Sequence, residues 1–363
     1  CHTLAIESPQ PRRYWPQVFS CSESKTVKKS ISMVDMFQSA IKDDQLLVAF
    51  EILKVYPEVA KIRTAILYEQ QQLSKDDLYR SGQLDGCGNE LSGGELPLHL
   101  ALEHLDLCLE TSVKLITSLI DLYPESVKEK TALLRSRCLT TTHGSNPPKI
   151  TDGGKLPLHI ALLNLKSSNQ IVMKLVKMFP GSLKVEIPVI YNAGNEEQVG
   201  GGLLPIHLTF TNRIRVDLNK YDTETFNFSI NVLNMIVKTY PKGVQVKTKL
   251  LNQNGTKWSK LRGGGMLPLH LALINEKTSY EDVMVLLKAY PEGVKERIPI
   301  TFRYTEPKGG KLPLHLALGN TKLNDKIIMA LIQAHPESVK ERSSLLIDTG
   351  AGGEDRDQIA GGL

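Results

Sequence analysis

The sequence lacks long apolar runs: no stretch approaches the ~18 consecutive apolar residues that a membrane-spanning helix needs. The segment 1–30 also lacks the charged start and apolar core of a secretory signal. The five cysteines are odd in number and include no Cys-x-x-Cys pair, a pattern typical of reduced thiols. We therefore expect no membrane insertion and an intracellular protein, cytoplasmic or nuclear.

Motifs that carry catalysis are missing as well. The glycine runs at 200–202 and 263–265 are not followed by Lys-Ser/Thr, so they are not phosphate-binding loops. Neither a Gly-x-Ser-x-Gly nucleophile elbow nor a His-Glu-x-x-His zinc helix occurs. These absences argue against an enzyme, and we expect no catalytic residue, cofactor or metal.

One motif, Gly-Gly-x-Leu-Pro-Leu-His-Leu-Ala-Leu, recurs with small changes in five copies. Proline has a helical φ and no amide hydrogen, so each copy is expected to open a helix. The glycine pair supplies the positive φ angles of a tight entry. The motif prolines are Pro97, Pro157, Pro205, Pro268 and Pro313, and the motif histidines are His99, His159, His207, His270 and His315.

An asparagine follows the motif histidine by five residues in four copies, at Asn164, Asn212, Asn275 and Asn320. Asparagine tolerates the left-handed conformation that often ends a helix. We therefore expect the first helix of each unit to have about two turns and to end at this asparagine.

A second signature closes each unit, at Tyr123-Pro124, Phe179-Pro180, Tyr240-Pro241, Tyr290-Pro291 and His335-Pro336. Apolar residues precede it at helical spacing, as in Val283, Leu286, Leu287 and Tyr290, which predicts the buried face of a second helix. The interval from motif histidine to closing proline is identical in three of five units, namely 159 to 180, 270 to 291 and 315 to 336. The arm from a closing proline to the next histidine varies instead, and is longest from 124 to 159 and shortest from 291 to 315. Constant helices joined by variable arms are typical of a solenoid.

Alternating apolar residues in the arms, beginning at Leu183 and at Val294, predict strands, and the glycine-rich return predicts β-hairpins. From Met33 to Tyr56 the pattern predicts two helices of a degenerate first unit, with Met36 at the histidine's position. At the other end, Gly361-Gly362-Leu363 matches the start of a further motif, so we expect another repeat to follow and the last unit to expose apolar surface.

The predicted organisation has three parts. Residues 1–30 form a flexible segment, and residues 31–89 form a degenerate capping helix pair with its arm. Five repeats then follow within residues 90–363, at about 90–150, 151–199, 200–262, 263–308 and 309–360.

The motif, the short helix, the longer helix and the returning arm resemble the ankyrin repeat, whose consensus has Thr-Pro-Leu-His at the same point. The resemblance covers residues 90–363 and implies a mainly α fold: an α-solenoid of stacked helix pairs with long, partly β-hairpin connecting arms. Leucine replaces the threonine in every copy, and a Tyr-Pro-Glu exit replaces the usual glycine turn. The interval between successive motif histidines, as from His207 to His270, also exceeds the repeat length of the family.

Without that threonine hydroxyl, each motif histidine must find another partner. Successive helix pairs would stack roughly 8–10 Å apart, so the five histidines cannot share one metal ion, whose ligands lie about 2.0–2.1 Å away. We expect each to bond the backbone at the mouth of its own arm.

The distribution of charge is the remaining indication of a binding site. The net charge is +5, yet residues 225–275 contain no acidic residue and seven basic ones. Candidate partner-binding residues in this basic arm are Lys247, Lys249, Lys257, Trp258, Lys260 and Arg262. Such a cluster attracts an acidic partner, although a solvated loop face is an equal alternative.

These observations predict a non-catalytic, monomeric scaffold that binds a protein partner on its concave and finger surface. Two alternatives stay open. The first is a nucleic-acid or polyanion binder that uses the basic arms. The second is a regulatory repeat module of a larger protein.

Overall fold

The computed structural model describes residues 32–65, 67–68, 90–136, 149–164, 166, 168–191, 198–211, 228–252, 261–299, 301–303, 306–342, 346–347 and 358–359. The chain divides into two compact units, Cys1–Ser32 and Met33–Leu363, and all described elements belong to the second. The fold is mainly helical. No helix among these residues combines the length and the apolar character that crossing a membrane requires.

The first helix of each pair begins, in all five motif copies, with the motif proline as its first residue. Both glycines before each motif have positive φ, which lets the chain turn sharply into the helix. These helices are α4 (Pro97–His104), α6 (Pro157–Leu163), α8 (Pro205–Thr211), α10 (Pro268–Ile274) and α12 (Pro313–Gly319), with α1 (Met33–Lys42) in the degenerate first pair.

The second helix of each pair carries the predicted apolar face. In the fifth pair Val283, Leu286 and Leu287 are buried, whereas Tyr290, which follows the helix, is only half-buried. Each of these helices ends one residue before the closing aromatic residue or histidine. They are α2 (Leu46–Val55), α5 (Glu110–Leu122), α7 (Asn169–Met178), α9 (Ile230–Thr239), α11 (Tyr280–Ala289) and α13 (Asp325–Ala334).

The closing proline begins a 3-10 turn in every unit, which the sequence did not predict. Proline suits this place because its φ fits a helical first turn. The turns are η1 (Pro57–Lys61), η2 (Pro124–Lys128), η3 (Pro180–Lys184), η4 (Pro241–Gln245), η5 (Pro291–Lys295) and η6 (Pro336–Val339).

The arms form antiparallel two-stranded hairpins, as expected. The strands are shorter than the alternation predicted, because Leu183 and Val294 lie in 3-10 turns and strand pairing starts only at Ile190 and Thr301. The pairs are β1 (Leu67–Tyr68) with β2 (Glu90–Ser92), β3 (Leu134–Ser136) with β4 (Lys149–Asp152), β5 (Ile190–Tyr191) with β6 (Gln198–Gly200), β7 (Leu251–Asn252) with β8 (Leu261–Gly263), β9 (Thr301–Arg303) with β10 (Glu306–Lys308), and β11 (Leu346–Ile347) with β12 (Gln358–Ile359).

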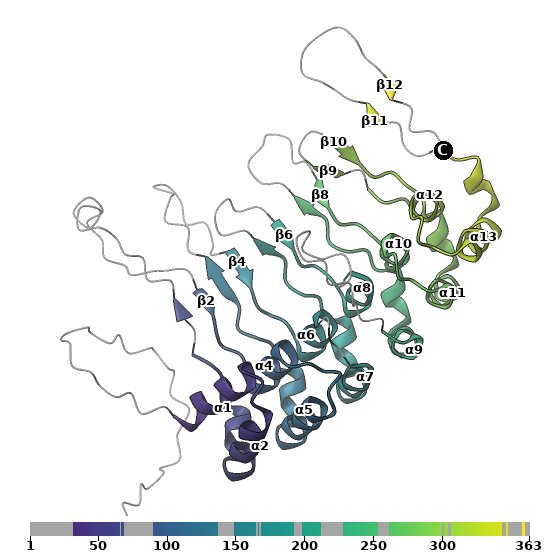
Figure 1. Cartoon of the computed structure of the whole chain (residues 1–363). Helices are drawn as coiled ribbons and strands as arrows, with labels where there is room; N and C mark the ends of the chain where they lie inside the picture. Colours follow the sequence, from purple (N-terminus) through teal and green to yellow (C-terminus); the bar gives the residue numbers. More distant parts are fainter. Residues whose placement is uncertain are drawn as a thin grey trace, which may run out of the picture. The chain divides into compact units, whose positions relative to one another are not determined.

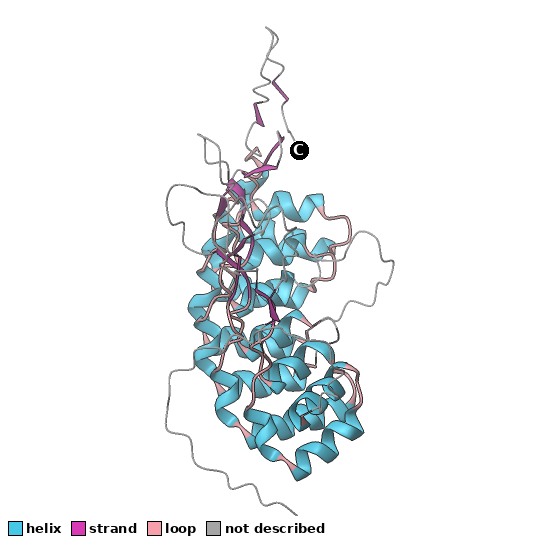
Figure 2. Ribbon diagram, turned by 90° about the vertical axis from the view of Figure 1, so that its left-hand side faces the viewer, coloured by secondary structure: helices cyan, strands magenta, loops and turns pink. Residues whose placement is uncertain are grey.

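Consecutive units lie side by side. Along the chain, each first helix contacts the first helix of the next pair, from α1 through α4, α6, α8 and α10 to α12 (Figure 1). Neighbouring hairpins contact each other in the same way, β2 with β3, β4 with β5, β6 with β7 and β8 with β9. The strands gather along one edge of the helices (Figure 2). One continuous apolar core therefore joins residues from Phe37 in α1 to Leu331 in α13.

The prediction that asparagine ends the first helix in the left-handed conformation was wrong. Asn164, Asn275 and Asn320 all have negative φ and extended backbone, and Asn212 lies outside the described residues. The side chain instead joins units: the Asn164 amide donates to the carbonyls of Leu102 (2.8 Å) and Leu105 (3.1 Å) in the preceding pair. Asn275 and Asn320 reach back to the preceding pair in the same way.

We expect Asn164→Ala to lower the free energy of unfolding by about 1–3 kcal/mol, because two carbonyls would lose their donor. The Asn164 side-chain oxygen also accepts the Lys166 amide (2.8 Å). Urea unfolding measures the change. Lys166→Ala, an exposed site, is the control and should cost less than about 0.5 kcal/mol. Equal effects of the two substitutions would show that the asparagine does not connect the units.

Candidate functional site

Each motif histidine connects the start of its helix to the mouth of its arm. In the first motif, the Leu96 amide donates to Nδ1 of His99 (3.1 Å), and Nε2 donates to the Glu129 carbonyl (3.0 Å). Because Nδ1 faces a donor and Nε2 faces an acceptor, the neutral imidazole with its proton on Nε2 satisfies both bonds. The carbonyls that accept from the other four histidines, His159, His207, His270 and His315, belong to Val185, Val246, Glu296 and Glu341.

Burial keeps four of these imidazoles neutral. It lowers the pKa of His99, His159, His207 and His270 to about 4, although the bond to the backbone carbonyl opposes the shift. Among the described residues, no group of three or more His, Cys, Asp or Glu is placed to hold a metal ion. The motif histidines therefore have a structural role, in which each one joins the start of its helix to the backbone at the mouth of its arm.

Gln38, and not Met36, occupies the histidine's position in the first helix pair. Its side-chain amide donates to the Ile62 carbonyl (3.4 Å), and Ile62 follows the closing proline by five residues, as every carbonyl bound by a motif histidine does. Met36 is exposed. Counting back from Pro57 by the interval of the other units missed this, because the interval from Gln38 to Pro57 is shorter than the interval from His159 to Pro180.

We expect His270→Ala to lower the free energy of unfolding by roughly 1–3 kcal/mol, since the Leu267 amide and the Glu296 carbonyl would lose their partner. Chemical denaturation measures the change, and metal analysis of both proteins should find no stoichiometric zinc. Zinc in the wild type that is lost on this substitution would overturn the assignment.

Ion pairs connect the bases of neighbouring arms. Arg63 pairs with Glu129 and Arg297 pairs with Glu341 at equivalent places in their units, and both arginines also donate to backbone carbonyls. Lys247 continues this series, because its Nζ lies 2.8 Å from Glu296 of the next unit. Lys249 lies 2.6 Å from Glu186 of the preceding unit.

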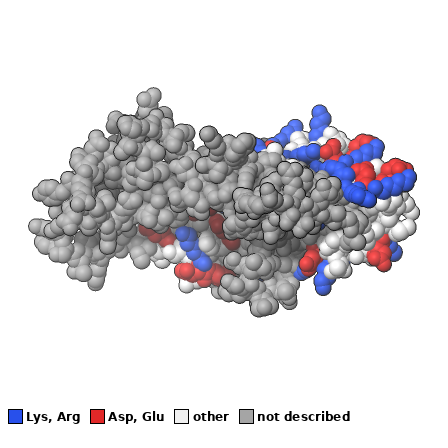
Figure 3. All heavy atoms as spheres, turned by 90° about the horizontal axis from the view of Figure 1, so that it is seen from above, with Lys and Arg blue, Asp and Glu red and all other residues white. Residues whose placement is uncertain are grey.

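The positive charge of the basic arm is therefore partly neutralised by other units, although the arm itself contains no acidic residue. Two of its lysines are countered by carboxylates from adjacent units, and basic and acidic side chains are interspersed on the described surface in Figure 3. Lys257, Trp258 and Lys260 lie outside the described residues, and Arg262 is described only as backbone within β8.

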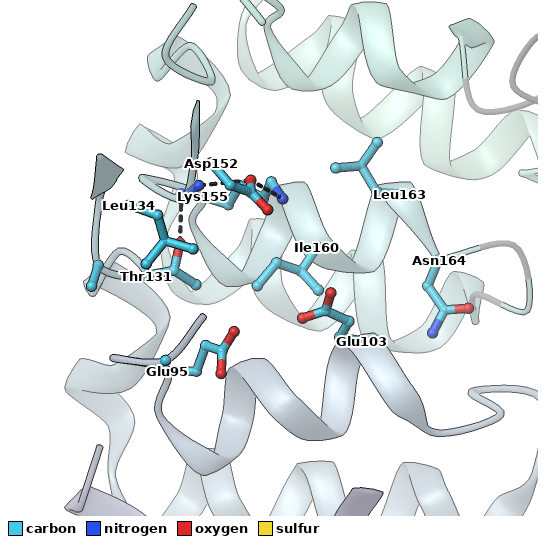
Figure 4. Close-up of a pocket in the computed structure, with 12 residues that line it drawn as sticks. Glu95, Glu103, Thr131, Leu134, Asp152, Lys155, Ile160, Leu163 and Asn164 are labelled. Carbon is cyan, nitrogen blue, oxygen red and sulfur yellow. Dashed lines mark hydrogen bonds and ion pairs between the residues drawn. The ribbon is translucent and has the colours of Figure 1, made fainter. Parts of the chain in front are cut away.

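A pocket of about 330 Å³ lies where two first helices meet the hairpin bases (Figure 4). Helix α4 and the segment before it supply Glu95 and Glu103, and α6 supplies Ile160 and Leu163. The hairpin β3–β4 and the residues beside it contribute the remaining wall, which includes Thr131, Leu134, Asp152 and Lys155.

Carboxylates dominate the charge of this pocket. Lys155, the basic residue among its lining residues, lies 2.7 Å from Asp152. Within the described part of the chain no ion pair involves Glu95 or Glu103, whose carboxylates point toward the same space in Figure 4. Burial, followed by the nearby Glu103, raises the pKa of Glu95. Both effects disfavour the charged form of Glu95, and a cation bound between the two carboxylates would stabilise that charged form.

The sequence did not predict this pocket, although an alignment of the motif copies shows that its two glutamates are unusual. Glu95 occupies the variable place before Leu-Pro, where the other copies have Lys155, Leu203, Met266 and Lys311. Glu103 follows the histidine by four residues, where the others have Leu163, Thr211, Ile274 and Gly319. Only the first copy has an acid at both places.

No protein-family model matches this sequence, and a comparison with curated proteins found no match. The pocket and the arms are thus the basis for a functional proposal.

Proposed function

We propose that the chain is a non-catalytic interaction scaffold, an α-solenoid of ankyrin-like repeats that binds a protein partner on its concave and finger surface. The observation that carries the proposal is the pocket between α4, α6 and the hairpin bases. The motif histidines and asparagines form hydrogen bonds within and between the repeats, which leaves the side chains between helices and hairpins to vary from unit to unit.

The lining of the pocket defines the partner's chemistry. Ile160, Leu163 and Leu134 offer an apolar wall, while Glu95 and Glu103 offer negative charge. An arginine or lysine side chain fits both, because its aliphatic stem can lie against apolar residues while its cationic head meets carboxylates. We therefore propose a partner segment that inserts a basic side chain.

The charge balance of the arms disfavours the nucleic-acid alternative. Lys247 and Lys249 already have carboxylate partners, and a phosphate would have to displace them. Nucleic acid held by lysine and arginine would also be released steeply as salt rises, with a log-log slope of about 0.9 per phosphate on duplex DNA.

The test compares Glu103→Lys with Glu110→Lys as a matched control. Both glutamates are exposed, but Glu110 lies on α5 outside the pocket and pairs with Lys114. A photo-crosslinking residue at Leu163 should capture the partner, and Glu103→Lys should reduce that capture by more than about tenfold, whereas Glu110→Lys should not. Equal capture by both variants contradicts the pocket as the binding site. Steeply salt-dependent binding to generic DNA or RNA would favour the alternative.

A further inference from the structure

The second helices α7 and α9, with the turns η3 and η4 that follow them, contain no acidic residue. They lie within two acid-free runs of the sequence, residues 153–185 and 225–275. Each of the other second helices, taken with its turn, includes at least two acidic residues. Packing of the units does not require this difference, because α7 and α9 bury apolar residues of the same kinds as α5.

A glutamate that directly follows the closing proline balances the lysine of the turn in three of the other units. These ion pairs are Lys128 with Glu125 (2.8 Å), Lys295 with Glu292 (2.8 Å) and Lys340 with Glu337 (3.0 Å). Gly181 replaces the glutamate in η3, and Lys242 replaces it in η4. The turn of the third helix pair therefore lacks a counter-charge, and that of the fourth pair gains a positive charge.

Four exposed lysines gather where α7 and α9 end. Lys177 and Lys238 hold equivalent positions, two residues before the closing aromatic residue, while Lys184 and Lys242 belong to the turns. Helix α9 contacts both α7 and η3 (Figure 1). The Nζ atom of Lys184 lies 5.9 Å from the ring centre of Tyr240, which has Lys238 and Lys242 two residues to either side. We call Lys177, Lys184, Lys238 and Lys242 the lysine corner.

The charge of the lysine corner is not balanced by acidic side chains. Within the part of the chain that the structure describes, none of its four lysines forms an ion pair, whereas Lys174 of the same helix α7 pairs with Asp121. The helix dipole favours Lys177 and Lys238 at the C-terminal ends of their helices, but it does not account for Lys242 in the turn. The corner is therefore a departure from the repeat that leaves positive charge at the surface.

Apolar side chains accompany these lysines and indicate what they bind. Met178 is 36% exposed, and Phe179 and Tyr240 are half-buried. Protein interfaces are poor in lysine and rich in arginine, and nucleic-acid recognition also favours arginine. Neither the two helices nor their turns contain an arginine. An anionic lipid surface suits lysine and apolar residues together, because ammonium groups meet the headgroups while apolar side chains enter the boundary with the acyl chains.

We propose that the lysine corner binds a membrane surface that contains anionic phospholipids. The contact is peripheral and inserts no helix into the bilayer. The corner lies on second helices, whereas the proposed partner-binding pocket lies between first helices and hairpins, so the two can be occupied together. This inference is independent of that pocket, and a partner bound there would be held beside the membrane.

Sedimentation of the intact chain with lipid vesicles tests the proposal. Wild type should bind vesicles of phosphatidylcholine with phosphatidylserine and should not bind vesicles of phosphatidylcholine alone. Lys177→Gln, Lys184→Gln, Lys238→Gln and Lys242→Gln, combined in one chain, should weaken binding by more than about hundredfold, because each lysine near an anionic bilayer contributes about fivefold. Met178→Gln alone should weaken binding severalfold, since it removes an apolar contact.

The matched control removes four exposed lysines from other helix pairs and so changes the net charge equally. It combines Lys128→Gln, Lys288→Gln, Lys295→Gln and Lys340→Gln, and should bind nearly as tightly as wild type, because charges away from the contact are screened by salt. Far-ultraviolet circular dichroism checks that both variants fold. Absence of wild-type binding to anionic vesicles, or equal losses in the two variants, would overturn the proposal. Binding to duplex DNA or polyglutamate that is lost in the corner variant, while its vesicle binding persists, would overturn it as well.

Discussion

Acidification from pH 7.5 to pH 5 should destabilise the protein strongly, because four buried histidines must then remain neutral while the unfolded chain takes up protons. Folding lowers the pKa of His99, His159, His207 and His270 from 6.5 to about 4. Their contribution to stability is therefore fully present above pH 6.5 and is lost as the pH falls toward 4. At pH 5 each histidine would lower the free energy of unfolding by about 2 kcal/mol, and the four together by about 8 kcal/mol.

Urea unfolding at pH 7.5, 6 and 5 measures this loss as a falling midpoint. Glu129 and Glu341 have lowered pKa values and would destabilise the fold only at more acidic pH, whereas the raised pKa of Glu95 acts in the opposite direction. His159→Gln is the control, since Gln38 shows that glutamine can bond the equivalent carbonyl and glutamine does not titrate. This variant should be less stable at pH 7.5 and lose about a quarter of the pH dependence. A midpoint that does not change between pH 7.5 and 5 would contradict the buried neutral histidines.

Leu286→Ala should lower the free energy of unfolding by about 2–5 kcal/mol, because it removes buried methyl groups and leaves a cavity in the core. Leu286 is buried in α11 and belongs to the continuous core that joins the units. Lys288, two residues further along the same helix, is exposed, and Lys288→Ala should cost well under about 1 kcal/mol. Thermal or chemical unfolding of both variants compares the two sites, and similar losses would mean that the buried face of α11 is assigned wrongly.

Local chemistry made most of the fold predictable from the sequence. Proline can begin a helix at little cost, so Pro97 and its equivalents indicated where each first helix starts. The spacing of Val283, Leu286 and Leu287 indicated the face of the second helix that is buried. Period-two alternation overestimated the strands, because the same spacing near Leu183 serves a 3-10 turn.

Contacts between units could not be predicted, since they depend on which unit lies beside which. Asn164 fits a helix C-terminus in isolation, yet its side chain bonds the carbonyls of the preceding helix pair. The acid-free run around Lys247 looked like a uniform positive surface, but Glu296 from the next unit balances that lysine. The pocket at Glu95 and Glu103 likewise forms only when two units and a hairpin meet.

We propose a linear array of helix pairs, in which the stability of each pair depends only on its neighbours. Deleting residues 310–343 tests this proposal most directly. We expect the shortened chain to keep α1 to α9 folded, with amide hydrogen-exchange protection close to that of the full chain. Loss of protection should be confined to α10, α11 and the hairpin that preceded the deletion. Cooperative loss of protection throughout the chain would contradict the array.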